Sequence, residues 1–194
     1  MVWKDQVEVM NRTVGKIVLH VTMPLDGFIA GLNDEMDWVF KYGGPDEVVD
    51  EVIKTTGAVV LGKRTFEVSL KQNQLPYGGA VKVPQFVVTH EARDTATIGG
   101  LMFTFVTEGV ERAVELAKTA AGDRNVSLLG ASIDQQCLKI GLADEIVIHL
   151  VPILLSEGIR LFDHLGTGSI ELEKTKVVSS TGITSLRFRV IKGH

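Results

Sequence analysis

Cysteine is almost missing from this sequence of 194 residues, because Cys137 is the only one. A disulfide within the chain is therefore excluded, and so is a zinc site built from several cysteines. We expect Cys137 to be a small buried apolar residue, which is the usual environment of a free cysteine. Such a chain suits a reducing compartment, and we expect it in the cytoplasm.

Long apolar runs are also missing. The most apolar stretch, residues 146–155, is broken by His149 and Pro152. A membrane-spanning helix needs about 20 apolar residues, so we expect no contact with a membrane. The first residues lack the apolar core of a signal peptide. We interpret residues 1–13 as an N-terminal extension and residues 14–194 as a single domain, as the length allows.

Positive charge is not in excess, because 20 Lys and Arg face 24 Asp and Glu, for a formal net charge of −4. A nucleic-acid partner is not expected, since binding it requires a basic face. The sequence has no HExxH motif for a metal and no GxSxG motif for a serine nucleophile. It also lacks the GxGxxG and Walker motifs. The sequence motifs therefore give no support to a hydrolase or to the commonest nucleotide-binding folds.

The apolar pattern predicts an alternation of strands and helices. That alternation is typical of a mainly parallel sheet covered on both faces, and the last two strands indicate an antiparallel hairpin. The predicted strands are residues 16–22, 58–61, 85–89, 102–106, 125–129, 145–155, 171–178 and 184–191, and the predicted helices are residues 46–56, 65–72, 110–121 and 132–140.

Three predicted strands are followed by residues suited to anions, at residues 61–65, 89–90 and 129–132. A helix N-terminus holds phosphate through its unpaired N–H groups and its dipole. After the second strand, Gly62 allows close backbone approach, Lys63 and Arg64 supply cations, and Thr65 supplies a hydroxyl. Gly130 precedes another predicted helix and marks a second anion site. These segments are equally compatible with ordinary strand-to-helix turns.

The five histidines show no metal-binding spacing. His20 and His149 fall inside predicted strands. We interpret both as hydrogen-bonded core or interface residues.

Several segments resemble a known family. Residues 23–30 (MPLDGFIA) resemble the S-L-D-G-x-I-A segment of the reductase domain at the C-terminus of bifunctional riboflavin-biosynthesis deaminase–reductases. Residues 60–67 (VLGKRTFE) resemble the G-R-x-T-[YFW]-E segment that this domain shares with dihydrofolate reductases. Residues 128–132 resemble its V-x-G-G-A turn, and residues 141–162 resemble its G-L-v-D-E and P-v-l-l-G-x-G-x-x-L-F block. The similarity runs in the right order from about residue 15 to the end.

This resemblance implies a dihydrofolate-reductase-like three-layer α/β sandwich, with a mainly parallel central sheet and an antiparallel C-terminal hairpin. It also implies NADPH as the cofactor. Carried over, Gly62, Lys63, Arg64 and Thr65 would hold the pyrophosphate and the adenosine-side phosphate, Thr89 and His90 would lie by the adenosine ribose and its 2′-phosphate, Gly130, Ala131, Ser132 and Ile133 would face the pyrophosphate, and Thr22, Ile29 and Ala30 would line the nicotinamide.

The resemblance also suggests residues for substrate and catalysis. Asp26 would lie in a lid loop over the active site, and Trp38 belongs to a segment similar to the M-P-W of dihydrofolate reductases. Counting from the Gly62 motif places the substrate-binding acid at Asp46, with Asp50 one helical turn further along the same side. The alternative for Asp46 is a solvated helix N-cap.

The implied function is an NADPH-dependent reductase that transfers a hydride to a pterin, a folate or a riboflavin precursor of the 5-amino-6-(5-phosphoribosylamino)uracil type. A water held by Asp26 or Asp46 would deliver the proton, which requires a carboxyl pKa raised by partial burial. The sequence departs from the family at two of these positions. Ala131 replaces a family glycine, and its methyl group slightly blocks one backbone approach. Leu129 stands where riboflavin reductases often carry Glu, which weighs against a phosphoribosyl substrate.

Two alternatives to catalysis remain open. One is a binding module that keeps the nucleotide pocket without turnover, and the other is a structural dimer without a ligand. We also expect a homodimer, partly from the resemblance, because the apolar strand at residues 145–155 is long enough to pair or pack across a twofold axis. The alternative for that strand is a fully buried central position.

Overall fold

The computed structural model describes residues 15–42, 46–166 and 168–192, so the proposed extension over residues 1–13 lies outside the described residues. The strands are β1 (Ile17–Pro24), β2 (Phe28–Ala30), β3 (Thr56–Gly62), β4 (Gln85–Val88), β5 (Ala96–Ile98), β6 (Leu101–Val106), β7 (Asn125–Leu129), β8 (Glu145–Val151), β9 (Ile159–Arg160), β10 (Leu172–Ser180) and β11 (Ile183–Val190). The helices are α1 (Glu47–Thr55), α2 (Lys63–Lys71), α3 (Val110–Ala121) and α4 (Ala131–Lys139), with short 3-10 helices η1 (Leu32–Asp34), η2 (Asp37–Lys41) and η3 (Pro76–Gly79).

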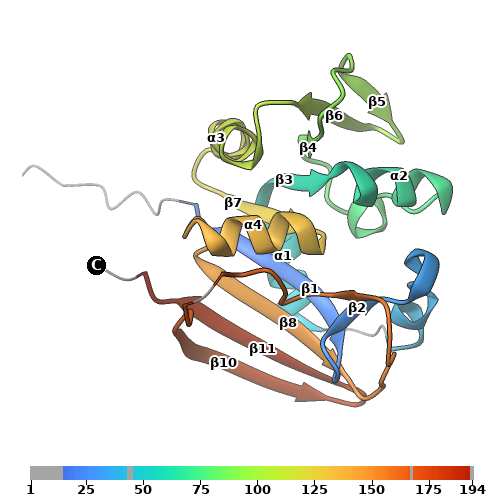
Figure 1. Cartoon of the computed structure of the whole chain (residues 1–194), viewed down its shortest axis with the longest axis vertical. Helices are drawn as coiled ribbons and strands as arrows, with labels where there is room; N and C mark the ends of the chain where they lie inside the picture. Colours follow the sequence, from blue (N-terminus) through green and yellow to red (C-terminus); the bar gives the residue numbers. More distant parts are fainter. Residues whose placement is uncertain (1–14, 43–45, 167, 193–194) are drawn as a thin grey trace, which may run out of the picture.

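In the described part of the chain, nine strands form one sheet in the order β10-β11-β8-β1-β7-β3-β4-β6-β5. The six strands from β8 to β6 run parallel to one another. The hairpin of β10 and β11 joins one side of the sheet, where β11 pairs antiparallel with β8. On the other side, β5 pairs antiparallel with β6. Figure 1 shows these two antiparallel additions at opposite ends of the sheet. The carboxyl ends of the parallel strands therefore meet at one edge.

Alternation along β1 divides the core into two faces, because successive strand residues point to opposite sides of a sheet. Ile17 and Leu19 pack with α3 and α4, whereas Val18 packs with α1 and with Val147 of β8. Phe66 of α2 covers the neighbouring strands on the α1 side. The sheet is thus the middle layer of three.

These observations confirm the predicted α/β sandwich with its mainly parallel sheet and C-terminal hairpin. The strand expected at residues 145–155 is shorter than predicted and ends at Val151, because Pro152 has no N–H for a ladder. Gly57 lies within β3, where an added Cβ would be 2.9 Å from Cβ of Ala121. The short strands β2, β5 and β9 were not predicted.

The position of β8 corrects one expectation about assembly. β8 pairs with β1 on one side and with β11 on the other. Both of its hydrogen-bonding edges are therefore occupied, and it cannot pair with a second copy. No helix among the described residues is long and apolar enough to cross a membrane. Cys137 is fully buried and free, as expected.

Candidate functional site

The first turns of α2 and α4 meet at the carboxyl edge of the sheet. Gly62 is the N-cap of α2 and Gly130 is the N-cap of α4, and neither helix has a side-chain cap. Gly130 has a φ of 100°, and an added Cβ would lie 2.3 Å from Oγ1 of Thr65. An added Cβ at Gly62 would lie 3.6 Å from Cγ1 of Ile133. Two helix N-termini without capping side chains are thus in contact, which suits an anion.

The rest of the α4 start is divided by burial. Ala131 and Ile133 are buried, whereas Ser132 is exposed and its Oγ is 3.1 Å from Nε2 of Gln136. The structure therefore leaves Ser132 at the surface of the first turn, and gives the two apolar residues a packing role.

The two predicted phosphate-binding cations are already paired with carboxylates. Lys63 contacts Glu91 and lies 3.7 Å from Glu67. Nε of Arg64 lies 2.8 Å from Oδ1 of Asp34, in the predicted lid loop. The side chains of Lys63 and Arg64 are 34% and 69% exposed, and ion pairs this open contribute about 0–1 kcal/mol. A phosphate group that binds here would therefore displace Glu91 and Asp34 with little loss of free energy.

The end of β4 brings Thr89 and His90 close to the same edge. Thr89 is 5% exposed, and its Oγ1 accepts a hydrogen bond of 3.0 Å from the N–H of Glu91. His90 is exposed. Lys63 is the main cause that lowers the pKa of Glu91 to about 2, with Arg93 second. Glu91 is therefore a full negative charge beside Lys63.

The predicted lid is anchored at several points. Ile29 and Ala30 are buried in β2, which pairs with β9. Oδ2 of Asp26 accepts a hydrogen bond of 2.8 Å from the N–H of Ser156. Oδ1 of Asp26 is buried without a partner among the described residues. Asp26 thus joins the loop after β1 to the loop after β8.

Asp46 is the N-cap of α1, but it is buried, with 7% exposed. Its Oδ1 accepts hydrogen bonds from the N–H groups of Val48 and Val49 at 2.7 and 3.3 Å. Its Oδ2 accepts one of 2.6 Å from the hydroxyl of Ser185. Burial acts to raise the pKa of Asp46, but these hydrogen bonds outweigh it and lower the pKa. The expectation of a raised pKa is therefore wrong for Asp46.

The other predicted substrate residues lie in different environments. Asp50 is exposed on α1 and does not share the environment of Asp46, because the capping side chain turns back toward the first turn of the helix. The expectation that both acids project along one side is wrong. Trp38 in η2 is 9% exposed, and its Nε1 has no partner within the described ranges.

A chain of polar side chains crosses the sheet on its α1 face. Nε2 of His20 lies 2.7 Å from Nε2 of His149, and Nδ1 of His149 lies 2.7 Å from Oγ of Ser185. Nδ1 of His20 lies 3.1 Å from the hydroxyl of Tyr77, which in turn contacts the hydroxyl of Ser127. Both histidines are hydrogen-bonded in the core, as the sequence indicated. His149 is also the register partner of Thr22, on the adjacent strand.

Sequence reasoning missed Tyr77, Ser127, Ser185 and Asp134. Asp134 is buried in α4, and its Oδ1 has no partner in the described part of the chain. Burial raises the pKa of Asp134 well above its ordinary value. Polar residues at inward positions of apolar strands, and an acid on the apolar face of a helix, are signals that would have found them.

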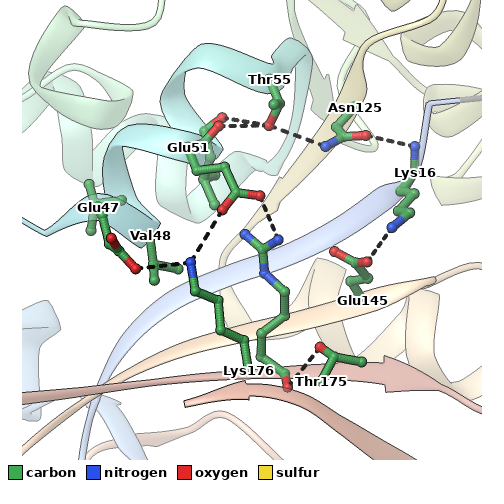
Figure 2. A network of polar contacts seen from close by, with 12 residues as sticks. Lys16, Glu47, Val48, Glu51, Thr55, Asn125, Glu145, Thr175 and Lys176 are labelled. Atoms are coloured by element: carbon green, nitrogen blue, oxygen red, sulfur yellow. Dashed lines mark hydrogen bonds and ion pairs between the residues drawn. The ribbon is translucent and has the colours of Figure 1, made fainter. Parts of the chain in front are cut away.

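A separate hollow of about 410 Å³ lies at the opposite end of the sheet, lined in part by Lys16, Glu51 and Arg187. Figure 2 shows Glu47 and Glu51 of α1 facing Lys176, and Lys16 beside Glu145. Glu51 also binds Arg187 at 2.6 Å. The ion pairs of Glu47 and Glu51 join α1 to the C-terminal hairpin. Ligands of open α/β sheets bind at the other end, beyond the strands' carboxyl ends.

Comparison with known proteins settles the family. The model of the RibD C-terminal domain matches residues 15–184. The chain belongs to the RibD C-terminal domain family. It is 27% identical over 152 residues to the uncharacterized protein YwjB of Bacillus subtilis (strain 168), covering 77% of this chain and 84% of YwjB.

Solved structures show the same fold as this RibD C-terminal domain. A candidate riboflavin biosynthesis protein from Shewanella sp. PV-4 superposes with a TM-score of 0.75 at 22% identity, covering 91% of this chain and 99% of that one. Dihydrofolate reductase from Enterococcus faecalis, complexed with NADP(H), gives a TM-score of 0.62 at 16% identity, covering 92% and 98%. The dihydrofolate-reductase-like fold is therefore shown.

Gly130→Ala tests the contact between the two helix starts, with Gly109→Ala as a matched control. Gly109 is the N-cap of α3 and has a φ of 99°, but an added Cβ there meets nothing within 4 Å. In both variants alanine must adopt a strained backbone conformation, which lowers the free energy of unfolding by roughly 1–3 kcal/mol. We expect Gly130→Ala to lower the free energy of unfolding further, as measured by urea denaturation. Thr65→Ala should restore part of that excess in the double variant; equal losses for both glycines would contradict the close contact.

The two buried acids predict opposite pH effects on stability. The lowered pKa of Asp46 contributes stability that is present above the unfolded pKa and is lost as pH falls through the folded pKa. The raised pKa of Asp134 removes stability as pH rises above the unfolded pKa. At pH 7, Asp46→Asn should therefore lower the melting temperature and Asp134→Asn should raise it. Both differences should shrink below about pH 4; shifts of one sign for both would refute the assignment.

Proposed function

We propose that this protein is an NADPH-dependent reductase that transfers a hydride to a pterin, folate or riboflavin-precursor type of substrate. The observation that carries the proposal is the contact between the first turns of α2 and α4 at Gly130 and Thr65. A diphosphate bridging two helix N-termini is the chemistry that such a contact accepts. Membership of the RibD C-terminal domain family supports the same conclusion.

The residues present fit the cofactor. Gly62, Thr65 and Gly130 would hold the pyrophosphate, and an added Cβ at Gly130 would crowd Oγ1 of Thr65. Lys63 and Arg64 would neutralise the phosphates after leaving their carboxylate partners. Thr89 and His90 would lie by the adenosine ribose and its 2′-phosphate, and Thr22, Ile29 and Ala30 would line the nicotinamide. The cofactor supplies the hydride, and the protein aligns the reactants and excludes water.

The substrate side is proposed from the α1 face of the sheet. The polar chain through His20 and His149 lies directly beside Thr22 in the strand register. Polar groups with fixed hydrogen bonds are what a heteroaromatic ring with several nitrogen atoms requires. The substrate roles of Trp38 and Asp50, and the catalytic role of Asp26, remain predictions.

A second candidate is a nucleotide-binding protein without turnover. It is favoured by the state of Asp46, whose two oxygens already accept three hydrogen bonds within the protein. A carboxylate so engaged is less available to a pterin ring. NADPH oxidation followed at 340 nm with dihydrofolate, and separately with the riboflavin precursor, separates the two candidates.

We also propose a homodimer in the cytoplasm. Among the described residues β10 is the outer strand of its side of the sheet, and it exposes Leu172 and Val177. An exposed strand edge with apolar side chains is a ready surface for a second copy. A molecular mass in solution equal to one chain would remove this proposal.

The phosphate assignment predicts opposite effects at Lys63 and Glu91. Lys63→Ala should weaken NADPH binding about tenfold, or about 1.4 kcal/mol, because it removes a cation from a phosphate. Glu91→Gln should strengthen NADPH binding, because it removes the carboxylate that competes for Lys63. Both affinities are measured by titration calorimetry.

Arg112→Ala is the control, since Arg112 lies on α3 in an exposed pair with Glu115. It should leave NADPH affinity unchanged. NADH should bind more weakly than NADPH and respond less to Lys63→Ala. Equal NADPH affinity in wild type and Lys63→Ala would show that the phosphates lie elsewhere.

A further inference from the structure

The polar chain on the α1 face has a single consistent direction. Asp46 is a carboxylate, so its Oδ2 accepts, and the hydroxyl of Ser185 donates to it at 2.6 Å. The hydroxyl proton of Ser185 is then used, so Nδ1 of His149 donates to Ser185 at 2.7 Å. Burial is the main cause that lowers the pKa of His149, which is therefore neutral and carries one proton.

The same argument fixes the second histidine. Because the proton of His149 sits on Nδ1, its Nε2 accepts from Nε2 of His20 at 2.7 Å. Burial, followed by the nearby His149, lowers the pKa of His20 to about 3, so His20 is neutral too. Its Nδ1 is left without a proton and accepts from the hydroxyl of Tyr77 at 3.1 Å. Every hydrogen bond from Tyr77 onward thus points toward Asp46.

We infer that Asp46, Ser185, His149 and His20 form a proton relay that ends at Nδ1 of His20 and delivers the proton consumed in the reduction. The inference rests on the proposed reductase function, which requires one proton for each hydride. It assigns a role to two histidines that are otherwise only core residues.

The transfer balances atom by atom. In the loaded state, Asp46 carries the proton and donates to Ser185, Ser185 donates to Nδ1 of His149, Nε2 of His149 donates to Nε2 of His20, and Nδ1 of His20 carries a proton. Because hydrogen bonds lower the pKa of Asp46, the loaded state is the minor one at neutral pH, and its population falls as the pH rises. On discharge, the proton on Nδ1 of His20 leaves for the substrate, and each of the other three protons moves one place along the chain. The result is the arrangement in the structure, with Asp46 as carboxylate. Neither histidine becomes positively charged.

The outer end of the relay is held at Tyr77. Tyr77 has a φ of 54° and is followed by Gly78 at 60°, a backbone region that non-glycine residues seldom adopt. The bend lays the Tyr77 ring parallel to that of His20, with centroids 5.5 Å apart and planes 7° apart. Tyr77 and His20 are both half-buried, whereas His149 is 2% exposed. Strain kept at a hydrogen-bonded end of a relay indicates function.

The other charged groups near the relay come from β11, α1 and α4. Arg187 of β11 acts on both histidines and is paired with Glu51 of α1. Asp134 of α4 acts on Tyr77, and burial raises the pKa of Asp134 itself. Asp46 is the carboxylate in this set that is hydrogen-bonded to a member of the relay, through Ser185.

The first test reads the tautomers of the full-length protein by ¹⁵N NMR of the histidine rings. Wild type should show His149 protonated at Nδ1 and His20 protonated at Nε2. Asp46→Asn keeps the cap through its carbonyl oxygen but donates to Ser185 through its amide, so both histidines should switch to the opposite tautomer. Glu47→Gln, the same change of charge one residue away and exposed, should switch neither. Unchanged tautomers in Asp46→Asn would overturn the relay.

The second test separates the relay from the reductase itself. Ser185→Ala should lower the single-turnover rate of NADPH oxidation on the order of 10²-fold and abolish its decline with rising pH, while Ser185→Thr restores both. Wild-type rates and pH dependence in Ser185→Ala would overturn the relay and leave the reductase standing. No oxidation by wild type, with either candidate substrate, would overturn the reductase and the proton delivery with it, even if the tautomers switch.

Discussion

Six parallel strands end at one edge of the sheet, and this constraint places the residues that we propose to hold the cofactor. Because β3 and β7 are neighbours in the sheet, the helices that follow them begin side by side. Gly130 then fits against Thr65 only because it has no side chain. A paired set of helix N-termini follows from strand order, not from any single motif.

The same sheet carries a second, less usual feature. Its α1 face is apolar near the start of β1, where Val18 packs on Val48, and becomes polar at His20. A buried carboxylate at the α1 cap requires donors, and Ser185 with the two backbone N–H groups supplies them. Once that carboxylate is fixed, the direction of the remaining hydrogen bonds follows. The carboxyl half of β1 and the polar chain meet where Thr22 pairs with His149.

Periodicity and turn residues predicted most of the fold. The long helices at residues 46–56 and 110–121 carry apolar residues at helical spacing, and the structure places α1 and α3 there within a residue or so. The short strands β2, β5 and β9 were not predicted, because an alternation of apolar and polar residues cannot be recognised in three residues or fewer. β8 was extended too far because the apolar run continues past Pro152, whose effect is on hydrogen bonding and not on hydropathy.

The site was predictable only in part. Glycines followed by cations and hydroxyls at Gly62 and Gly130 can be read locally, whereas their contact depends on strand order. The partners of Lys63 and Arg64, at Glu91 and Asp34, lie 28 and 30 residues away in sequence. The link from Asp46 to Ser185 spans 139 residues. Contacts of that range have no signature in spacing, so a raised pKa for Asp46 was expected and a lowered one was found.

The most direct test of the central claim is a crystal structure of the protein grown with NADP⁺. We expect diphosphate density between the backbone N–H groups of the first turns of α2 and α4, with Lys63 turned away from Glu91 toward a phosphate. Density for the nucleotide at any other place, such as the hollow beside Lys16 and Arg187, would contradict the claim.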